Sequence, residues 1–207
     1  MYLSGVRNPA MRADLAAGRI GLLNTPTVAY RIDDTVAVWA MDNGCFAGTY
    51  PGDDAYLATL ERYSAHQTRC LFVAAPDVVG DADATLGLLE PMARRLRAAG
   101  WPVALVGQDG MEKMHVPWQL VDWLFVGGST EWKMSAGAEA LIARAQRHGK
   151  RVHVGRVNSA TRFRHFRSLG CDTADGTSIA FDPTGRLAEV RRWTSAPAAP
   201  FLWAVSR

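Results

Sequence analysis

The sequence predicts an α/β protein of the TIM (β/α)8-barrel class, folded as one compact domain over residues 1–193 with a tail over 194–207. Short apolar runs, rich in β-branched and aromatic residues, alternate with longer helical patterns. Strict alternation of strand and helix indicates a parallel sheet, and eight such units indicate closure into a barrel. The length of 207 residues suits one small barrel.

Each element follows from its own pattern. In residues 83–99, Leu86, Leu89, Met92 and Leu96 recur at three- and four-residue steps and form one apolar face. Glycines follow three of the helical patterns, where helices commonly end. The expected strands are residues 2–4, 20–23, 35–40, 70–75, 103–106, 123–126, 152–154 and 171–174. The expected helices are residues 55–66, 83–99, 136–148 and 160–169.

An open Rossmann-like sheet is the alternative architecture. Such a sheet usually carries a Gly-rich phosphate loop after its first strand, and no GxGxxG stands there in this sequence. The closed barrel is therefore the favoured fold. The segment SAPAAP near the end of the chain is typical of an extended tail.

Composition limits the compartment and the partners. The net charge of +3 permits a polyanionic partner without requiring one. Cys45, Cys70 and Cys171 have no CxxC spacing, which argues against a disulfide framework or a zinc site and favours a reducing compartment. No apolar run approaches the roughly 20 residues of a membrane span, and the first residues lack a signal-peptide core. We expect a cytoplasmic protein with no membrane contact, no metal and no cofactor.

Polar residues and glycines follow six of the expected strands, at the end where a barrel carries its catalytic groups. Any one of these loops alone is explained as a turn, because Asp, Asn and Gly are common turn residues. Three aspartates in one cleft, however, repel each other, which costs stability and favours a chemical purpose. Those aspartates are Asp42, Asp77 and Asp175, and the segments are residues 41–46, 76–77, 107–110, 127–129, 155–158 and 175–177.

In this order the segments resemble the queuine/guanine transglycosylase superfamily. Asp42-Asn43-Gly44-Cys45-Phe46 is similar to the family's Asp-Ser-Gly-Gly-Phe motif, Asp77 to its second acid, and Gly127-Gly128-Ser129 to its Gly-Gly-Leu segment. Residues 106–110, 153–158 and 170–175 resemble its Val-Gln-Gly-Gly, His-x-x-Gly-Val-Gly and Gly-x-Asp-x-x-Asp segments. The resemblance covers residues 35–178. Members of the family exchange guanine in tRNA or DNA for a 7-deazaguanine through a covalent glycosyl-aspartate.

The resemblance implies a pentosyltransferase of TIM-barrel fold. It implies that Asp175 is the nucleophile at C1′ and that Asp42 is the general acid and base. It also implies a base-binding set in which Phe46 stacks on the base, although a core aromatic is an equally good interpretation of Phe46. The implied base-binding residues are Asp77, Gln108, Gly127, Gly128, Phe46 and Asn43.

The zinc-bearing segment of the tRNA enzymes has no counterpart after Cys171, which favours DNA over tRNA as the partner. The incoming free base would be a 7-deazaguanine of the preQ0 type, and a partner protein or a homodimer stays open. Candidate nucleic-acid contacts are Arg156, Lys133, Arg162 and Arg164, with a solvated helix face as the alternative for the last two. We expect a structural role for His153, with a role in the pocket as the alternative, and for Asp172 either a structural role or one that supports a pocket residue.

Two further functions stay open at this point. Water could intercept the same covalent intermediate, which would make the protein an N-glycoside hydrolase, either a base-excising glycosidase or a nucleosidase. Alternatively, the barrel could bind a deazapurine or nucleic acid without catalysis. The presence of both Asp42 and Asp175 disfavours this last interpretation.

Overall fold

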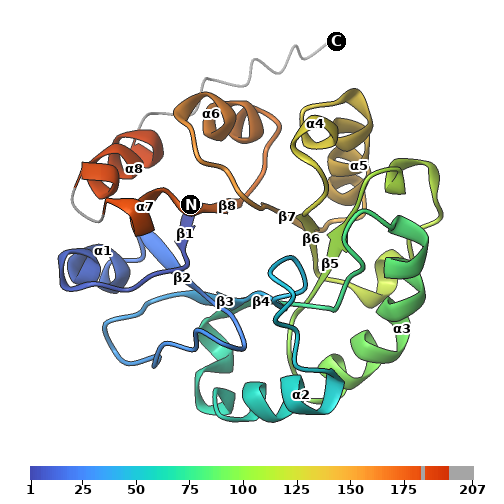
Figure 1. The fold of residues 1–207 in the computed structure, drawn as a ribbon, viewed down its shortest axis with the longest axis horizontal. Helices are drawn as coiled ribbons and strands as arrows, with labels where there is room; N and C mark the ends of the chain where they lie inside the picture. The colour runs from blue at the N-terminus through green and yellow to red at the C-terminus, as the bar shows by residue number, and fades with distance from the viewer. Residues whose placement is uncertain (183–184, 196–207) are drawn as a thin grey trace, which may run out of the picture.

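The computed structural model describes residues 1–182 and 185–195, without the side chains of Phe181 and Ser195. Eight parallel strands close into a barrel, because the last strand pairs with the first as well as with its neighbour (Figure 1). The predicted TIM barrel is therefore confirmed, and the open sheet is excluded. The strands are β1 Tyr2–Ser4, β2 Ile20–Asn24, β3 Trp39–Met41, β4 Cys70–Ala74, β5 Val103–Gly107, β6 Trp123–Val126, β7 Arg151–Val154 and β8 Thr173–Gly176.

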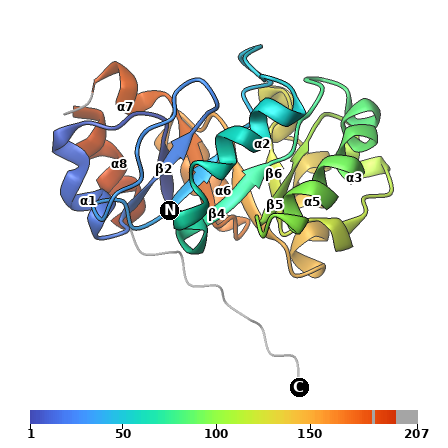
Figure 2. The same ribbon diagram turned by 90° about the horizontal axis from the view of Figure 1, so that it is seen from below.

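Helices surround the barrel on the outside (Figures 1 and 2). They are α1 Arg12–Ala16, α2 Asp53–Glu61, α3 Ala82–Ala98, α4 Thr130–Lys133, α5 Ala136–Arg147, α6 Ala160–Ser168, α7 Ser178–Phe181 and α8 Gly185–Ser195. Short 3-10 helices lie at Pro9–Met11, Ser64–Arg69, Met111–Lys113 and Trp118–Leu120. Within the described ranges, no helix is long and apolar enough to cross a membrane. Helix α8 enters the range expected as a tail, and the rest of that range, from residue 196, lies outside the described residues.

Side-chain caps explain why three of the helices begin where they do. Asp81, Ser135 and Ser159 each stand directly before a helix and accept a hydrogen bond from a backbone N–H of its first turn. Such caps satisfy donors that a helix start leaves open. The helices predicted at residues 83–99, 136–148 and 160–169 consequently form within one residue of the expected bounds.

The alternation of side chains along the strands separates two apolar layers. Successive residues point to opposite faces, so that along β5 Val103 and Leu105 pack outward against helices while Ala104 and Val106 fill the barrel. The inner layer is a separate cluster of Leu3, Leu23, Ala40, Phe72, Ala74, Ala104, Val106, Trp123 and Phe125. The same period of two places His153 and Asp175 on inward positions of β7 and β8.

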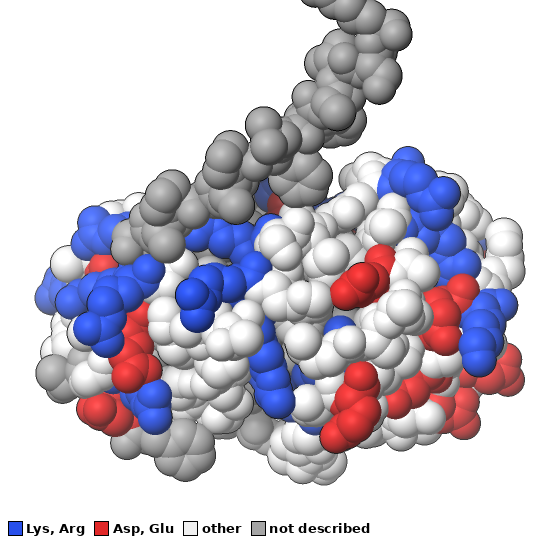
Figure 3. Space-filling view, turned by 90° about the horizontal axis from the view of Figure 1, so that it is seen from above, with Lys and Arg blue, Asp and Glu red and all other residues white. Residues whose placement is uncertain are grey.

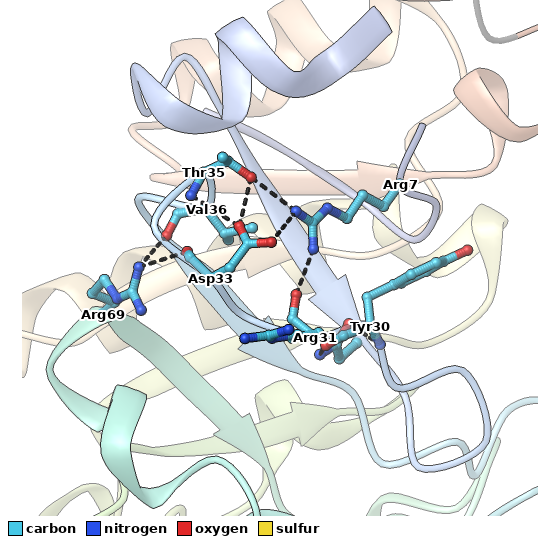
Figure 4. Close-up of polar contacts among 8 residues, drawn as sticks. Arg7, Tyr30, Arg31, Asp33, Thr35, Val36 and Arg69 are labelled. Atoms are coloured by element: carbon cyan, nitrogen blue, oxygen red, sulfur yellow. Dashed lines mark hydrogen bonds and ion pairs between the residues drawn. The ribbon is translucent and has the colours of Figure 1, made fainter. Parts of the chain in front are cut away.

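The segment between β2 and β3 contains no helix and is held by polar contacts (Figure 4). Arg7 donates to the carbonyl of Arg31, to Asp33 Oδ2 at 2.6 Å and to Thr35 Oγ1 at 2.8 Å. Arg69 donates to the carbonyls of Asp33 and Val36. The strand expected at residues 35–40 is therefore wrong in its first part. The backbone N–H and the hydroxyl of Thr35 donate to Asp33 Oδ1, and the pairing of β3 with β2 begins only at Trp39.

Candidate active site

One pocket opens at the carboxyl end of the strands, with an empty volume of about 480 Å³ including its mouth. Its polar lining comes from the loops that follow β3, β4, β5 and β7 and from Asp175 on β8, whereas its apolar lining comes from the barrel interior and from nearby loops. The lining residues are Asp42, Asn43, Phe46, Asp77, Val79, Val106, Gln108, Phe125, Gly127, Gly155, Arg156 and Asp175.

Asp42 follows β3 and lies two residues after Ala40, on the inward face. Its backbone N–H donates to the carbonyl of Asn24, and its Oδ1 accepts from the N–H of Gly44 at 2.7 Å. Burial raises the pKa of Asp42 to about 6, although the Gly44 N–H acts in the opposite direction, and the charges of Asp175 and Asp77 raise it further. Asp42 can therefore hold or release a proton near neutral pH.

Asp175 belongs to a row of three polar side chains inside the barrel. Its Oδ2 lies 2.8 Å from His153 Nε2, and its Oδ1 accepts from the N–H of Arg156 at 3.1 Å. The other imidazole nitrogen, Nδ1, lies 2.8 Å from Thr173 Oγ1. With the proton on Nε2, His153 donates to Asp175 and accepts from Thr173, which satisfies all three side chains. The row fixes the direction in which the Asp175 carboxylate points.

Asp77 is held by two amide side chains. Asn43 Nδ2 donates to its Oδ1 and Gln108 Nε2 donates to its Oδ2, each at 2.7 Å. The two amide oxygens are also engaged, since Asn43 accepts from the N–H of Cys45 and Gln108 accepts from the N–H of Gly80. Burial raises the pKa of Asp77, while the donated hydrogen bonds oppose that rise. Asn43, Asp77 and Gln108 therefore form one wall of the pocket, and their side chains hydrogen-bond mainly to each other and to nearby backbone.

The loop after β6 brings backbone close to the pocket. A Cβ on Gly127 would lie 2.5 Å from Val106 Cγ1, and a Cβ on Gly128 would lie 2.2 Å from Asp109 Oδ1. Asp109 accepts from both the N–H and the hydroxyl of Ser129, at 2.6 Å each. Only glycine fits at the two positions, because any larger residue would displace their neighbours.

Arg156 spans the mouth of the pocket from the end of β7. Its guanidinium lies over the ring of Phe46, with Cζ 4.1 Å from the ring centroid. It also donates to the carbonyls of Gly127 and Gly128. Phe46 is 63% exposed, so it is a pocket aromatic and not a core residue.

The other expected nucleic-acid contacts are separated by the structure. Lys133 is buried, and its Nζ donates to the carbonyl of Gly155 at 2.6 Å, so it is not available to a polymer backbone. Burial lowers the pKa of Lys133 to about 8. Arg164 is exposed on α6 and Arg162 is half-buried there. On the face shown in Figure 3, the acidic side chains of the described residues lie between the basic ones.

Some site residues were not expected from the sequence. Thr173 supports His153 beneath Asp175, and Asp109 anchors the loop after β6. A signal existed for both, since Thr173 stands two residues before Asp175 on the same strand face and Asp109 belongs to a strand-end segment. Asp172, in contrast, stands before β8, where its Oδ2 accepts from the N–H of Val152, in keeping with the expected structural role. In the described part of the chain, no three His, Cys, Asp or Glu residues are grouped to hold a metal ion.

Comparison with known proteins supports the fold alone. No family model and no curated protein matches the chain. The 3-hexulose-6-phosphate synthase of Salmonella typhimurium is 15% identical, with a TM-score of 0.54, over 93% of this chain and 97% of that chain. A second 3-hexulose-6-phosphate synthase is 13% identical, with a TM-score of 0.46, over 93% of this chain and 98% of that chain.

A further solved structure is longer than this protein. It is a protein assigned as a glycerophosphoryl diester phosphodiesterase, from Silicibacter pomeroyi, 16% identical with a TM-score of 0.46. The match covers 87% of this chain, which spans about half (54%) of the length of that chain.

These findings overturn the resemblance to the guanine transglycosylases. The solved structure with the higher TM-score is another TIM barrel and no family model matches, so the predicted family and the base exchange are wrong, and a pentosyltransferase activity has no support. The alternatives of N-glycoside hydrolysis and of a silent deazapurine- or nucleic-acid-binding barrel fit no better. The physical reason is that the motifs consist mainly of Asp, Asn and Gly at strand ends. Any parallel barrel places such residues there in chain order, so their order and placement report the fold.

Proposed function

We propose that this protein is an enzyme that transfers protons on a small organic substrate, with Asp42 as general acid and Asp175 as general base. The observation that carries the proposal is a pair of carboxyl groups that line one pocket in unlike surroundings. Burial raises the pKa of Asp42 to about 6, so that its protonated form is populated near neutral pH. His153 and the N–H of Arg156 stabilise the negative charge on Asp175. Enzymes divide the two roles between carboxyl groups in this way.

The lining of the pocket supports an uncharged or cationic substrate. Val79, Val106 and Phe125 supply apolar contact, whereas the carboxylates of Asp77 and Asp175 would repel an anion. The similar Salmonella protein is named for a phosphorylated sugar, but the likeness to it concerns the fold. The carboxylates of Asp77 and Asp175 argue against a phosphate group in this pocket.

The proposal is tested by substrate consumption. The wild-type protein is incubated with a panel of small polar metabolites, and mass spectrometry identifies those converted. Asp42→Asn and Asp175→Asn should each slow the conversion about 100- to 10,000-fold, the usual contribution of general acid–base catalysis. Asp83→Asn is the matched control, because Asp83 is an exposed carboxylate in the first turn of α3.

Both site variants must first be shown to fold, by circular dichroism and by a cooperative urea transition. A conversion that both site variants catalyse at the rate of the wild-type protein would rule out the proposed roles. A loss in the Asp83→Asn control equal to that in the site variants would also contradict them.

A further inference from the structure

The guanidinium of Arg156 is surrounded in the way that a bound planar cation would be. Its face lies on the ring of Phe46, at a distance where a cation and an aromatic ring attract each other. Its edge donates to two backbone carbonyls, those of Gly127 and Gly128. Its positive charge acts on the carboxylate of Asp77. An aromatic face, carbonyl acceptors and a nearby carboxylate together recognise guanidinium and amidinium groups.

Two of the surfaces that contact or face the guanidinium, the loop after β6 and Asp77, are held by hydrogen bonds that do not involve Arg156. The β6 loop is held by the hydrogen bonds between Asp109 and Ser129. The Asp77 wall is held by Asn43 and Gln108. A preformed set of acceptors costs little to organise, so it favours binding of any group that fits.

The backbone of Arg156 has an uncommon conformation. Its φ of 60° lies in the left-handed region, which non-glycine residues rarely adopt, and among the described residues it is the one non-glycine residue with positive φ. The side chain of Arg156 lines the pocket. Strained backbone of this kind often accompanies a ligand site.

We propose that the guanidinium of Arg156 occupies the binding position of a planar cationic group of the substrate, an amidinium or a guanidinium, which displaces the arginine side chain on binding. This position, between the ring of Phe46 and the carbonyls of Gly127 and Gly128, is called the seat below. The inference rests on the proposed function in one respect, namely that this pocket is the substrate site. It adds the chemical class of the group that the pocket recognises. The arginine then acts as an internal competitor that fills the seat when substrate is absent.

The test removes the competitor and offers its side-chain end as a free probe. In Arg156→Gly, ethylguanidinium should bind at least tenfold more tightly than to the wild-type protein, measured by isothermal titration calorimetry. Glycine suits the left-handed backbone, and Arg156→Asn, which also tolerates it, is the second variant. Arg164→Ala, which removes an exposed arginine on α6, should bind the probe no better than the wild-type protein.

Two matched measurements identify the seat. Adding Phe46→Ala to Arg156→Gly should weaken the binding of ethylguanidinium about tenfold, because the aromatic face is lost. Ethylurea, which has a similar shape but no charge, should bind at least tenfold more weakly than ethylguanidinium. The inference is overturned if neither Arg156 variant gains affinity for the cation, or if the gain persists without Phe46.

Failure of this inference can be told apart from failure of the proposed function. Probe binding requires no proton transfer. If the Arg156 variants bind ethylguanidinium as expected but Asp42→Asn and Asp175→Asn turn over substrate normally, only the proposed function is refuted. Loss of turnover in those variants, together with no gain of probe affinity in the Arg156 variants, would refute only the seat.

Discussion

His153 Nε2 lies 2.8 Å from Asp175 Oδ2, and this contact joins a fully buried imidazole to a carboxylate that is 13% exposed at the pocket. Phe72 and Phe125 pack against the imidazole, with ring centroids 4.9 Å and 4.4 Å from it. Thr173 holds the opposite nitrogen. The imidazole therefore cannot turn freely, and its fixed position determines where the Asp175 carboxylate points.

Replacing His153 should separate orientation from chemistry. His153→Leu removes the donor to Asp175, so we expect kcat to fall about 100-fold, the loss that a misplaced catalytic group can cause, with little change in KM. His153→Gln keeps an N–H donor and should retain more activity than His153→Leu. Steady-state kinetics on the substrate found by mass spectrometry provide the measurement. Equal losses in the two variants would show that the contact with Asp175 does not matter.

Asp42 should lower the stability of the protein at neutral pH. Its pKa is raised from 3.8 to about 6 in the fold, so the folded state prefers the protonated form. The contribution of Asp42 is fully favourable below pH 3.8 and is lost as the pH rises through 6. At about 1.4 kcal/mol per pKa unit, the loss at pH 8 is at most about 3 kcal/mol. Asp42→Asn should therefore stabilise the protein at pH 8.

Urea unfolding of Asp42→Asn and of the wild-type protein at pH 4 and pH 8 tests this prediction. The difference in the free energy of unfolding should be largest at pH 8 and small at pH 4. Carbon-13 NMR should show the Asp42 carboxyl titrating near pH 6. A stability difference that is the same at both pH values would mean that the carboxyl is not strained by its burial.

The sequence predicted the barrel well because its signals are local and repeated. β1 was predicted with its observed bounds, and β6 likewise, because short runs of apolar residues are bounded by turn residues. The period of two along the strands also explains why Asp42 and Asp175 reach one pocket. Both lie at strand ends, on inward positions that the neighbouring apolar residues define.

Other features could not be predicted, because they depend on contacts between distant segments. Residues 35–38 have an apolar, β-branched pattern, yet Arg7 and Arg69 hold this stretch as irregular backbone. The contact of Arg156 with Phe46 joins loops that lie far apart in the chain. The family resemblance failed for a related reason, since strand-end Asp and Gly residues are shared by barrels of unrelated function.

The ion pair between Asp14 and Arg191 should stabilise the protein, because it joins helix α1 to helix α8. Asp14 on α1 is buried and accepts from Arg19 and from Arg191 of α8. Burial acts to raise the pKa of Asp14, but the two arginines outweigh it and lower that pKa. Its contribution to stability is therefore present above pH 3.8 and is lost as the pH falls. Asp14→Asn should cost about 1–3 kcal/mol at pH 7, because the partner arginines are half-exposed and regain water.

Denaturant unfolding at pH 7 and at pH 3 checks this prediction, and the cost of Asp14→Asn should shrink at the lower pH. Glu90→Gln is the matched control. Glu90 pairs with Arg94 on the exposed side of α3, where an ion pair contributes less than about 1 kcal/mol. A cost for Asp14→Asn as small as that of the control would contradict a stabilising role for the buried pair.

Gly128→Ala should destabilise the loop after β6 by steric conflict. The added Cβ would lie 2.2 Å from Asp109 Oδ1 and 2.6 Å from Trp132 Cε3, so the Asp109 carboxylate would have to leave Ser129. Overpacking of this kind costs about 1–3 kcal/mol. Gly87→Ala is the matched control, because nothing lies within 4 Å of its Cβ and alanine favours the α3 helix by up to about 1 kcal/mol. Urea unfolding should therefore give opposite signs for the two substitutions, and a Gly128→Ala protein as stable as the wild type would show that the loop can shift without cost.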